Sequence, residues 1–447
     1  MSNRPETNKQ SCPVYKKCGG CQLQNLSYPE QLEFKQKKVE KLLKRFCTVE
    51  KIIGMKTPYH YRNKVQAAFY TDKKGKIISG VYQSGSHHVV GIDSCQTEDV
   101  IADKIIVAVR KLLPSFRMTT YNEDTGKGFL RHILVKRGFA TNQIMLVLVT
   151  GTPVFPSKNN FVKAILKQFP EITTIVQNIN PYRTNLVLGD NQKVLYGKGY
   201  IEDILCGCRF RISPKSFYQI NPVQTEVLYG KAIEFANLKG NETVLDTYCG
   251  IGTIGIIAAK NGAGNVIGAE LNGDAVRDAI VNARANNLKN IRFYKADAGE
   301  FMREATDEDE KPDVVFMDPP RAGSDRKFLD SLIKMSPKKV VYVSCNPETL
   351  ARDLAYLTQN SPYKAQKIQP VDMFPHTAHI ETVVLLSHKK PDGHINVKVE
   401  FGEGEGKVPL DNIAKRAESY KPKERVTYKM IKEYIEAKYG FKVHTAY

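Results

Sequence analysis

Cys345 stands at the carboxyl end of an apolar run, 339–345, and is followed by an Asn-Pro pair and a helix-like pattern. Small buried cysteines are common core residues, and most of them are inert. Ligands and chemistry in open α/β sheets, however, gather just beyond the carboxyl ends of the strands. Because a thiolate is soft and forms in part near neutral pH, a thiol in this place is a candidate nucleophile.

Glu381 opens a later β-branched run, and His376 and His379 come just before it. Carbon 5 of a pyrimidine ring becomes nucleophilic only after another group adds at carbon 6, and a thiolate is suited to that addition. A methyl group transferred to carbon 5 leaves a proton there that a carboxylate or an imidazole must remove. We therefore expect Cys345 and Glu381 to act together. The alternative is that Cys345 only packs and that Glu381 is only a charge at a strand end.

A glycine-rich turn, 249–255, separates a predicted strand from a predicted helix, and Asp246 lies at the end of that strand. Glu270 ends the next strand, where an acid that binds a ribose is expected. Asp297 ends a third strand, where it could reach an adenine edge. A dinucleotide fits this pattern, but a ligand with a sugar and an adenine, such as S-adenosylmethionine, fits it better.

Asp318 begins the sequence Asp-Pro-Pro-Arg-Ala-Gly after another apolar strand. Asp-Pro-Pro followed by an aromatic residue is typical of methylation at an exocyclic amine. Arg321 takes the place of that aromatic residue, which indicates a different target atom. A purely structural turn is the alternative, since Pro-Pro interrupts strands in any case.

Taken together, six segments resemble the RNA uracil-5-methyltransferase family, in the family's order and over roughly residues 12–387. They are SFYQINPVQTEVLY, LDTYCGIGTIG, GAELN, DPPRAG, VSCNPETLARDL and HIETVVLL. The resemblance implies that Cys345 is the nucleophile and that Glu381 removes the carbon 5 proton. It also implies that S-adenosylmethionine is held by Gln219, Tyr248, Thr253, Glu270, Asp297 and Asp318.

Four other cysteines have the spacing of a metal site: Cys12, Cys18 and Cys21 lie close together, and Cys95 is remote. Three near thiolates and one distant thiolate fit either zinc or an iron–sulfur cluster, and the spacing does not choose between them. The ribosomal-RNA branch of the family carries a [4Fe-4S] cluster on this pattern. The resemblance therefore implies a cluster of that kind, with a structural role.

The composition indicates a polyanionic partner. Lysine and arginine number 66 against 47 acids, for a net charge of +19, and phosphate contacts are the usual use of such an excess. Solubility alone is the alternative. Arg131 and Lys136 are among the candidate contacts, with Lys44, Arg45, Arg62 and Lys64. No apolar run approaches the roughly 20 residues of a membrane helix, and no signal peptide is evident, so we expect a cytoplasmic monomer.

The predicted fold is α/β: a C-terminal Rossmann-like, doubly wound methyltransferase domain follows a mixed α+β RNA-binding domain that carries the four cysteines. The expected divisions are a cysteine-cluster module (1–100), a central α+β domain (101–225), the methyltransferase domain (226–387) and an extension of unknown role (388–447). Only residues 1–11 precede Cys12, so we expect the β-barrel domain that many family members carry there to be missing.

The leading hypothesis is methylation of carbon 5 of a uridine in 23S ribosomal RNA. The same chemistry on transfer RNA is the first alternative, although that branch usually lacks the four cysteines. A non-catalytic RNA-binding iron–sulfur protein is the second. It would explain the charge and the cysteines but would leave Cys345, Glu381 and the glycine-rich turn unexplained.

Overall fold

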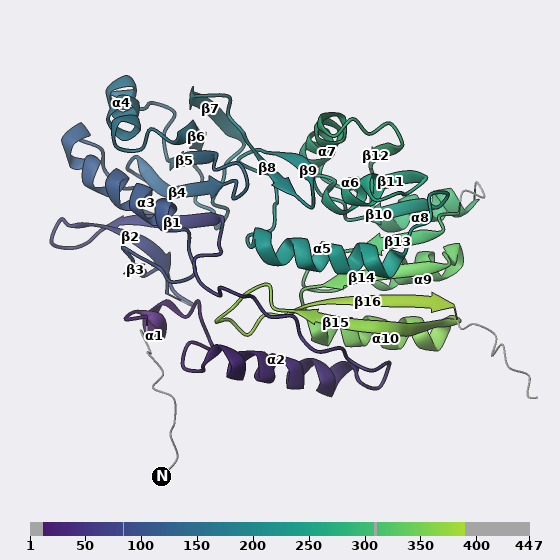
Figure 1. Ribbon diagram of the computed structural model, residues 1–447. Coiled ribbons are helices and arrows are strands. Elements are labelled where there is room, and N and C mark those ends of the chain that lie inside the picture. Colours follow the sequence, from purple (N-terminus) through teal and green to yellow (C-terminus); the bar gives the residue numbers. More distant parts are fainter. Residues whose placement is uncertain (1–11, 84, 308–310, 389–447) are drawn as a thin grey trace, which may run out of the picture. The chain divides into compact units, whose positions relative to one another are not determined.

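The computed structural model describes residues 12–83, 85–307 and 311–388, so the extension expected from residue 388 lies almost wholly outside the described residues. Two seven-stranded sheets and a two-stranded hairpin form this part of the protein (Figure 1). None of the helices within it has the length and apolar character needed to span a bilayer.

The first sheet has the strand order β3-β2-β1-β4-β5-β6-β7. Its strands are β1 (Lys64–Thr71), β2 (Ile77–Tyr82), β3 (Val89–Gly91), β4 (Leu130–Arg137), β5 (Ile144–Thr150), β6 (Ile172–Ile179) and β7 (Asn191–Tyr196). Only β5 and β6 are parallel, and the crossover between them contains α4 (Lys158–Gln168). A further helix, α3 (Val100–Leu112), and the 3₁₀ turn η1 (Pro114–Phe116) join β3 to β4. The sheet contains strands from both sides of residue 100, so the division expected there does not separate two sheets.

Two expected RNA contacts on β4 are buried. Arg131 is 4% exposed, and its guanidinium donates to the carbonyls of Asn180 and Tyr182. Lys136 is 5% exposed, and its ammonium donates to the carbonyls of Ser213 and Ser216. The expectation that these two side chains lie on the surface as phosphate contacts is therefore wrong, because backbone carbonyls hold both of them inside the protein.

The second sheet has the order β12-β11-β10-β13-β14-β16-β15. Its strands are β10 (Thr243–Thr247), β11 (Asn265–Glu270), β12 (Ile291–Lys295), β13 (Val314–Met317), β14 (Lys339–Ser344), β15 (Tyr363–Val371) and β16 (Glu381–His388). The first five strands in this order run parallel to one another, as expected. The expectation of a wholly parallel sheet is wrong for β16, which is antiparallel to both β14 and β15. The loop 372–380 joins β15 to β16, so the two strands form a hairpin, and its second strand inserts beside β14.

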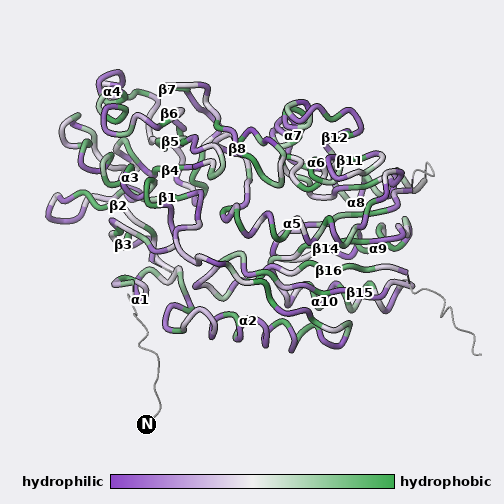
Figure 2. The backbone as a smooth tube through the Cα atoms, viewed as in Figure 1, coloured by the Kyte–Doolittle hydropathy of each residue, from purple (hydrophilic) through white to green (hydrophobic). Residues whose placement is uncertain are grey.

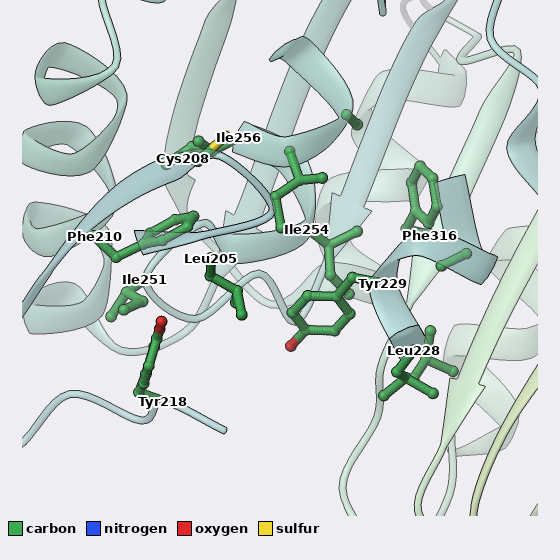
Figure 3. Packing of buried hydrophobic residues seen from close by; sticks show 14 of the residues in the cluster. Leu205, Cys208, Phe210, Tyr218, Leu228, Tyr229, Ile251, Ile254, Ile256 and Phe316 are labelled. Carbon is green, nitrogen blue, oxygen red and sulfur yellow. The ribbon is translucent and has the colours of Figure 1, made fainter. Parts of the chain in front are cut away.

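Helices cover both faces of this sheet, as expected for a doubly wound fold. The helices are α5 (Pro222–Ala236), α6 (Thr253–Lys260), α7 (Gly273–Ala285), α8 (Ala298–Asp307), α9 (Arg326–Met335) and α10 (Pro347–Asn360). On one face α5 and α6 pack with the hairpin of β8 (Ile201–Leu205) and β9 (Cys208–Ile212), and Figure 3 shows Leu205 and Phe210 of this hairpin near Ile251 and Tyr229.

The opposite face is covered by α8, α9, α10 and a helix from the N-terminal region, α2 (Tyr28–Leu43), which follows the short α1 (Tyr15–Cys18). Hydrophilic and hydrophobic residues alternate along α2 in Figure 2. Its buried residues recur every four positions: Gln31, Lys35, Val39 and Leu43. That spacing places them on one face. Val39 and Leu43 join the core, whereas Gln31 and Lys35 reach the loop that leads to β16.

Candidate functional site

A cavity of about 590 Å³ lies beyond the carboxyl ends of β10, β13 and β14. It brings together residues from distant parts of the chain, including most of the expected site residues. Those in its wall are Gln219, Tyr248, Thr253, Glu270, Asp318, Cys345 and Glu381. The place agrees with the rule that ligands in open α/β sheets bind at the carboxyl edge.

The pairing of β14 with β16 places the two expected catalytic residues opposite each other. Ser344, the last residue of β14, pairs with Thr382 in the antiparallel register. One further step along the same register puts Cys345 across from Glu381, the first residue of β16. Both side chains line the cavity.

The cavity shifts the protonation of this pair. Burial raises the pKa of the Cys345 thiol to about 11, and the carboxyls of Glu381 and Asp318 contribute to the rise, whereas Arg321 opposes it. Burial also raises the pKa of Glu381 well above its usual range, helped by Asp318 and opposed by Arg321. Burial raises the pKa of Asp318 to about 7. The substrate-free thiol therefore keeps its proton, and Arg321 is a cation that favours the charged forms of both Cys345 and Glu381.

Of the two histidines considered as alternative bases, only His379 lines the cavity. His376 is 3% exposed, and its ring nitrogens contact the amide of Gln31 at 3.2 Å and the carbonyl of Pro58 at 2.8 Å. Both nitrogens are thus engaged away from the cavity. His379 contacts Arg321, and burial together with that guanidinium lowers the pKa of His379.

The glycine-rich turn is held by two acids. Asp246 accepts a hydrogen bond from the Gly255 amide at 2.7 Å, and Glu270 accepts one from the Gly250 amide at 3.0 Å. A Cβ at Gly255 would lie 2.9 Å from a carboxyl oxygen of Asp246, so a side chain there would force the turn away from the strand. Gly250 and Gly252 have φ values of 55° and 80°, a conformation that favours glycine.

Asp297 is the one expected cofactor residue that does not line the cavity. Its carboxylate accepts hydrogen bonds from the amides of Gly299 at 3.0 Å and Glu300 at 3.1 Å, at the start of α8. It is close enough to Tyr248 to act on that phenol electrostatically. Its present contacts are those of a helix cap, and its role toward adenine stays a prediction.

Sequence reasoning missed two aromatic side chains in the cavity wall, Phe217 and Phe374, whereas Arg62, expected as an RNA contact, also lines the cavity. Phe217 is 65% exposed, which is unusual for a large apolar side chain that has no packing role. Phe217 lies two residues before Gln219 in the segment SFYQINPVQTEVLY. Its place in that segment could have indicated that it belongs to the site. Phe374 carried no signal, because only the fold brings its segment to the cavity.

The four N-terminal cysteines converge in part. Cys21 interacts electrostatically with Cys95, Cys18 and Cys12, and burial, followed by Cys95, raises the pKa of Cys21 to about 12. Within the described ranges, no three His, Cys, Asp or Glu side chains are arranged closely enough to hold a metal ion. Four thiols are the donor set that zinc or an iron–sulfur cluster requires.

Comparison with known proteins agrees with this geometry. Residues 182–389 match the family model described as tRNA (Uracil-5-)-methyltransferase. An uncharacterized RNA methyltransferase of Bacillus cereus is 44% identical over 388 residues, which span 86% of this chain and 84% of the relative. An uncharacterized RNA methyltransferase of Listeria monocytogenes is 46% identical over 379 residues, spanning 84% of this chain and 83% of the relative.

A solved structure is similar over most of the chain. It is the Pyrococcus abyssi tRNA (uracil-54, C5)-methyltransferase in complex with S-adenosyl-L-homocysteine, at 31% identity and a TM-score of 0.70. The match covers 82% of this chain and 85% of the other. The fold and the cavity define an α/β methyltransferase that uses S-adenosylmethionine. The chain belongs to the RNA uracil-5-methyltransferase family, and it is an RNA methyltransferase.

Proposed function

We propose that this enzyme methylates carbon 5 of a uridine in 23S ribosomal RNA, with Cys345 as the nucleophile and Glu381 as the base. The observation that carries the catalytic assignment is the single cavity in which the strand register sets these two side chains opposite each other. A thiol and a carboxyl at one sheet edge are the two groups that substitution at carbon 5 requires.

The roles of the protein follow from the chemistry of uracil. Cys345 first gives its thiol proton to solvent. The resulting thiolate forms a bond to carbon 6, and the electron pair displaced from the carbon 5–carbon 6 double bond makes carbon 5 nucleophilic. Bound S-adenosylmethionine supplies the methyl group that carbon 5 accepts. Glu381 must be ionised for the next step, and the nearby Arg321 favours its charged form against the effect of burial. Its carboxylate then takes the carbon 5 proton, the double bond re-forms, and the bond to sulfur breaks to release the Cys345 thiolate.

The cofactor assignment uses the residues around the glycine-rich turn. Glu270, at the end of β11, would accept hydrogen bonds from ribose hydroxyls. Gln219, Tyr248, Thr253 and Asp318 would line the rest of the cofactor, and Asp297 would contact adenine. The described cavity, about 590 Å³ in volume, is of the size that small-molecule and cofactor sites have.

The choice of ribosomal RNA rests on the four cysteines. Cys12, Cys18, Cys21 and Cys95 would hold a [4Fe-4S] cluster, with zinc as the alternative, and Cys21 lies within electrostatic range of the other three. Transfer RNA is the second candidate substrate, because the similar solved structure acts on uracil-54 of tRNA. Incubating the enzyme and tritiated S-adenosylmethionine with unmodified 23S and transfer RNA transcripts tests the choice. Labelled 5-methyluridine in transfer RNA alone would contradict the ribosomal assignment.

The catalytic assignment is tested on a denaturing gel with labelled RNA. Cys345→Ala should bind RNA and S-adenosylmethionine but transfer no methyl groups. Glu381→Gln cannot accept the carbon 5 proton, so the covalent protein–RNA adduct should accumulate and survive denaturation. Full methylation by Cys345→Ala would exclude the mechanism. Absence of the adduct with Glu381→Gln would instead move the role of base to His379 or to water.

A further inference from the structure

A second cavity, of about 490 Å³, lies at the far end of β1 from the methyltransferase site. We call it the β1-end cavity. Its wall is formed by the end of β1, the turn after it, β2, the segment 118–124 and the start of β4. Tyr70, Tyr82 and Tyr121 supply aromatic surface in it, and Tyr70 is 40% exposed. None of the groups in this wall takes part in the chemistry proposed above.

Two carboxylates line the cavity, Glu123 and Asp124, and Glu123 is the one that neighbouring side chains hold in place. Glu123 accepts a hydrogen bond from the Tyr82 hydroxyl at 3.0 Å on one oxygen and from His87 at 2.8 Å on the other. Burial alone would raise the pKa of Glu123, but these two hydrogen bonds outweigh it and lower the pKa. The carboxylate is therefore ionised at neutral pH. Each of its oxygens keeps a further lone pair for a ligand.

Three polar atoms in the same wall lack a hydrogen-bond partner among the described residues. They are Nε of Arg131, Oη of Tyr121 and Nδ1 of His132, and their side chains are 4%, 5% and 5% exposed. Buried polar groups are nearly always hydrogen-bonded, so three such atoms beside one cavity indicate a polar environment that water or a ligand completes after a small rearrangement. Burial, followed by Arg131, lowers the pKa of His132 to about 4, which leaves a neutral ring able to donate and to accept.

The surroundings favour a nucleotide as that ligand. The turn between β1 and β2 lines the cavity through Gly75 and carries three exposed lysines, Lys73, Lys74 and Lys76, whose positive charge favours a phosphate. At the other end of the strand, Arg62 lines the methyltransferase cavity. The strand rise puts Arg62 and Thr71 about 30 Å apart. A nucleotide in the β1-end cavity would thus lie several positions from the target uridine on one RNA.

We propose that the β1-end cavity binds an unpaired nucleotide of the RNA substrate, whose base stacks on Tyr70 and donates its exocyclic amine to Glu123. This inference rests on the proposed function, since it assigns a second contact to the same RNA. Stacking of a base on an aromatic side chain contributes about 1–3 kcal/mol, and sequence-specific RNA recognition relies on unpaired bases of this kind. A carboxylate accepts from the exocyclic amines of adenine, cytosine or guanine, whereas uracil offers only its single ring N3–H.

The chain contains no tryptophan, so one introduced tryptophan reports on its own surroundings alone. Tyr70→Trp places it in the β1-end cavity, and Tyr196→Trp is the matched control, because Tyr196 is 42% exposed on β7 of the same sheet. Unmodified 23S and transfer RNA transcripts are titrated into each full-length variant. Stacking should quench the fluorescence of Tyr70→Trp, while that of Tyr196→Trp should change little. Absence of quenching by an RNA that the enzyme methylates would overturn the proposal.

The carboxylate is tested by Glu123→Gln, with exposed Glu171→Gln as a charge-matched control. Glu123→Gln should weaken RNA binding by about fivefold or more and leave the methylation rate at saturating RNA unchanged. Adenosine and cytidine monophosphates should quench Tyr70→Trp more strongly than uridine monophosphate. Equal quenching by all three would overturn the role of Glu123. Quenching without any methyl transfer would instead contradict the proposed function and leave the nucleotide site standing.

Discussion

Lys35 on α2 and Asp372, just after β15, form an ion pair with an Nζ–Oδ1 distance of 2.5 Å, and neither side chain is exposed to solvent. The Tyr28 hydroxyl donates to the other oxygen of Asp372 at 2.8 Å, and the Lys35 ammonium also donates to the carbonyl of Phe374 at 3.0 Å. These contacts hold α2 against the loop 372–380, which leads to Glu381. Burial lowers the pKa of Lys35, and Asp372 opposes that shift.

Lys35→Met should destabilise the protein by about 3–5 kcal/mol, because it leaves the Asp372 charge buried without its partner. The double variant Lys35→Met, Asp372→Leu should recover part of that loss, since no lone charge remains. Lys37→Met removes a lysine that is 71% exposed and paired with Glu33, and it should change stability little. Urea unfolding monitored by circular dichroism measures all three. A double variant no more stable than Lys35→Met would show that the pair itself holds the helix in place.

Alkylation of Cys345 by iodoacetamide should speed up about tenfold per pH unit from pH 7 to 9.5, because only the thiolate reacts. No plateau is expected in this range, since burial and the carboxyls of Glu381 and Asp318 raise the pKa of the thiol to about 11. Arg321→Gln should slow the reaction further, because Arg321 lowers that pKa. Mass spectrometry of the Cys345 peptide follows the reaction, with the Cys47 peptide as an internal standard. A plateau below pH 9 would contradict the expected environment.

Asp246→Asn should stabilise the cofactor-free protein at pH 8 relative to pH 4. Burial raises the pKa of Asp246 to about 8 from its ordinary value of 3.8. Unfolding therefore releases a proton between these pH values, and the stability of the wild type falls as the pH rises through the window. The amide keeps an acceptor for the Gly255 amide and has no proton to lose. The gain at pH 8 should exceed about 1 kcal/mol in urea unfolding, and exposed Asp190→Asn should show no such gain.

Gly255→Ala should weaken S-adenosylmethionine binding about tenfold or more. The new Cβ would lie 2.9 Å from the Asp246 carboxyl and would displace the glycine-rich turn. Gly230→Ala, in α5, is the control, since no atom lies within 4 Å of the new Cβ and alanine favours a helix. Isothermal titration calorimetry of both variants measures the effect. Equal affinity in the two would show that the turn adapts to a side chain.

The sequence predicts local features of the site well. Cys345 directly follows β14 and Glu381 begins β16, as the apolar runs and their flanking residues indicate. The antiparallel direction of β16 could not be predicted, because an apolar strand carries no sign of its direction. The strand that precedes it, β15, is rich in polar residues, so the sequence did not indicate the β15–β16 hairpin that reverses the direction of β16. Burial of Arg131 was equally hidden, since its partners are backbone carbonyls from the distant segment 180–182.

Because β16 lies between β14 and β15 in the sheet, the sheet cannot be completed until the last described strand has been synthesised. Glu381, the proposed base, belongs to the final strand of the described fold, so a nascent chain can form the glycine-rich turn long before it contains this carboxyl group. A chain that stopped after β15 would leave the backbone of β14 unpaired along one side. Open strand edges of this kind recruit other chains, so premature termination should yield aggregates and not a partly active protein that competes for RNA.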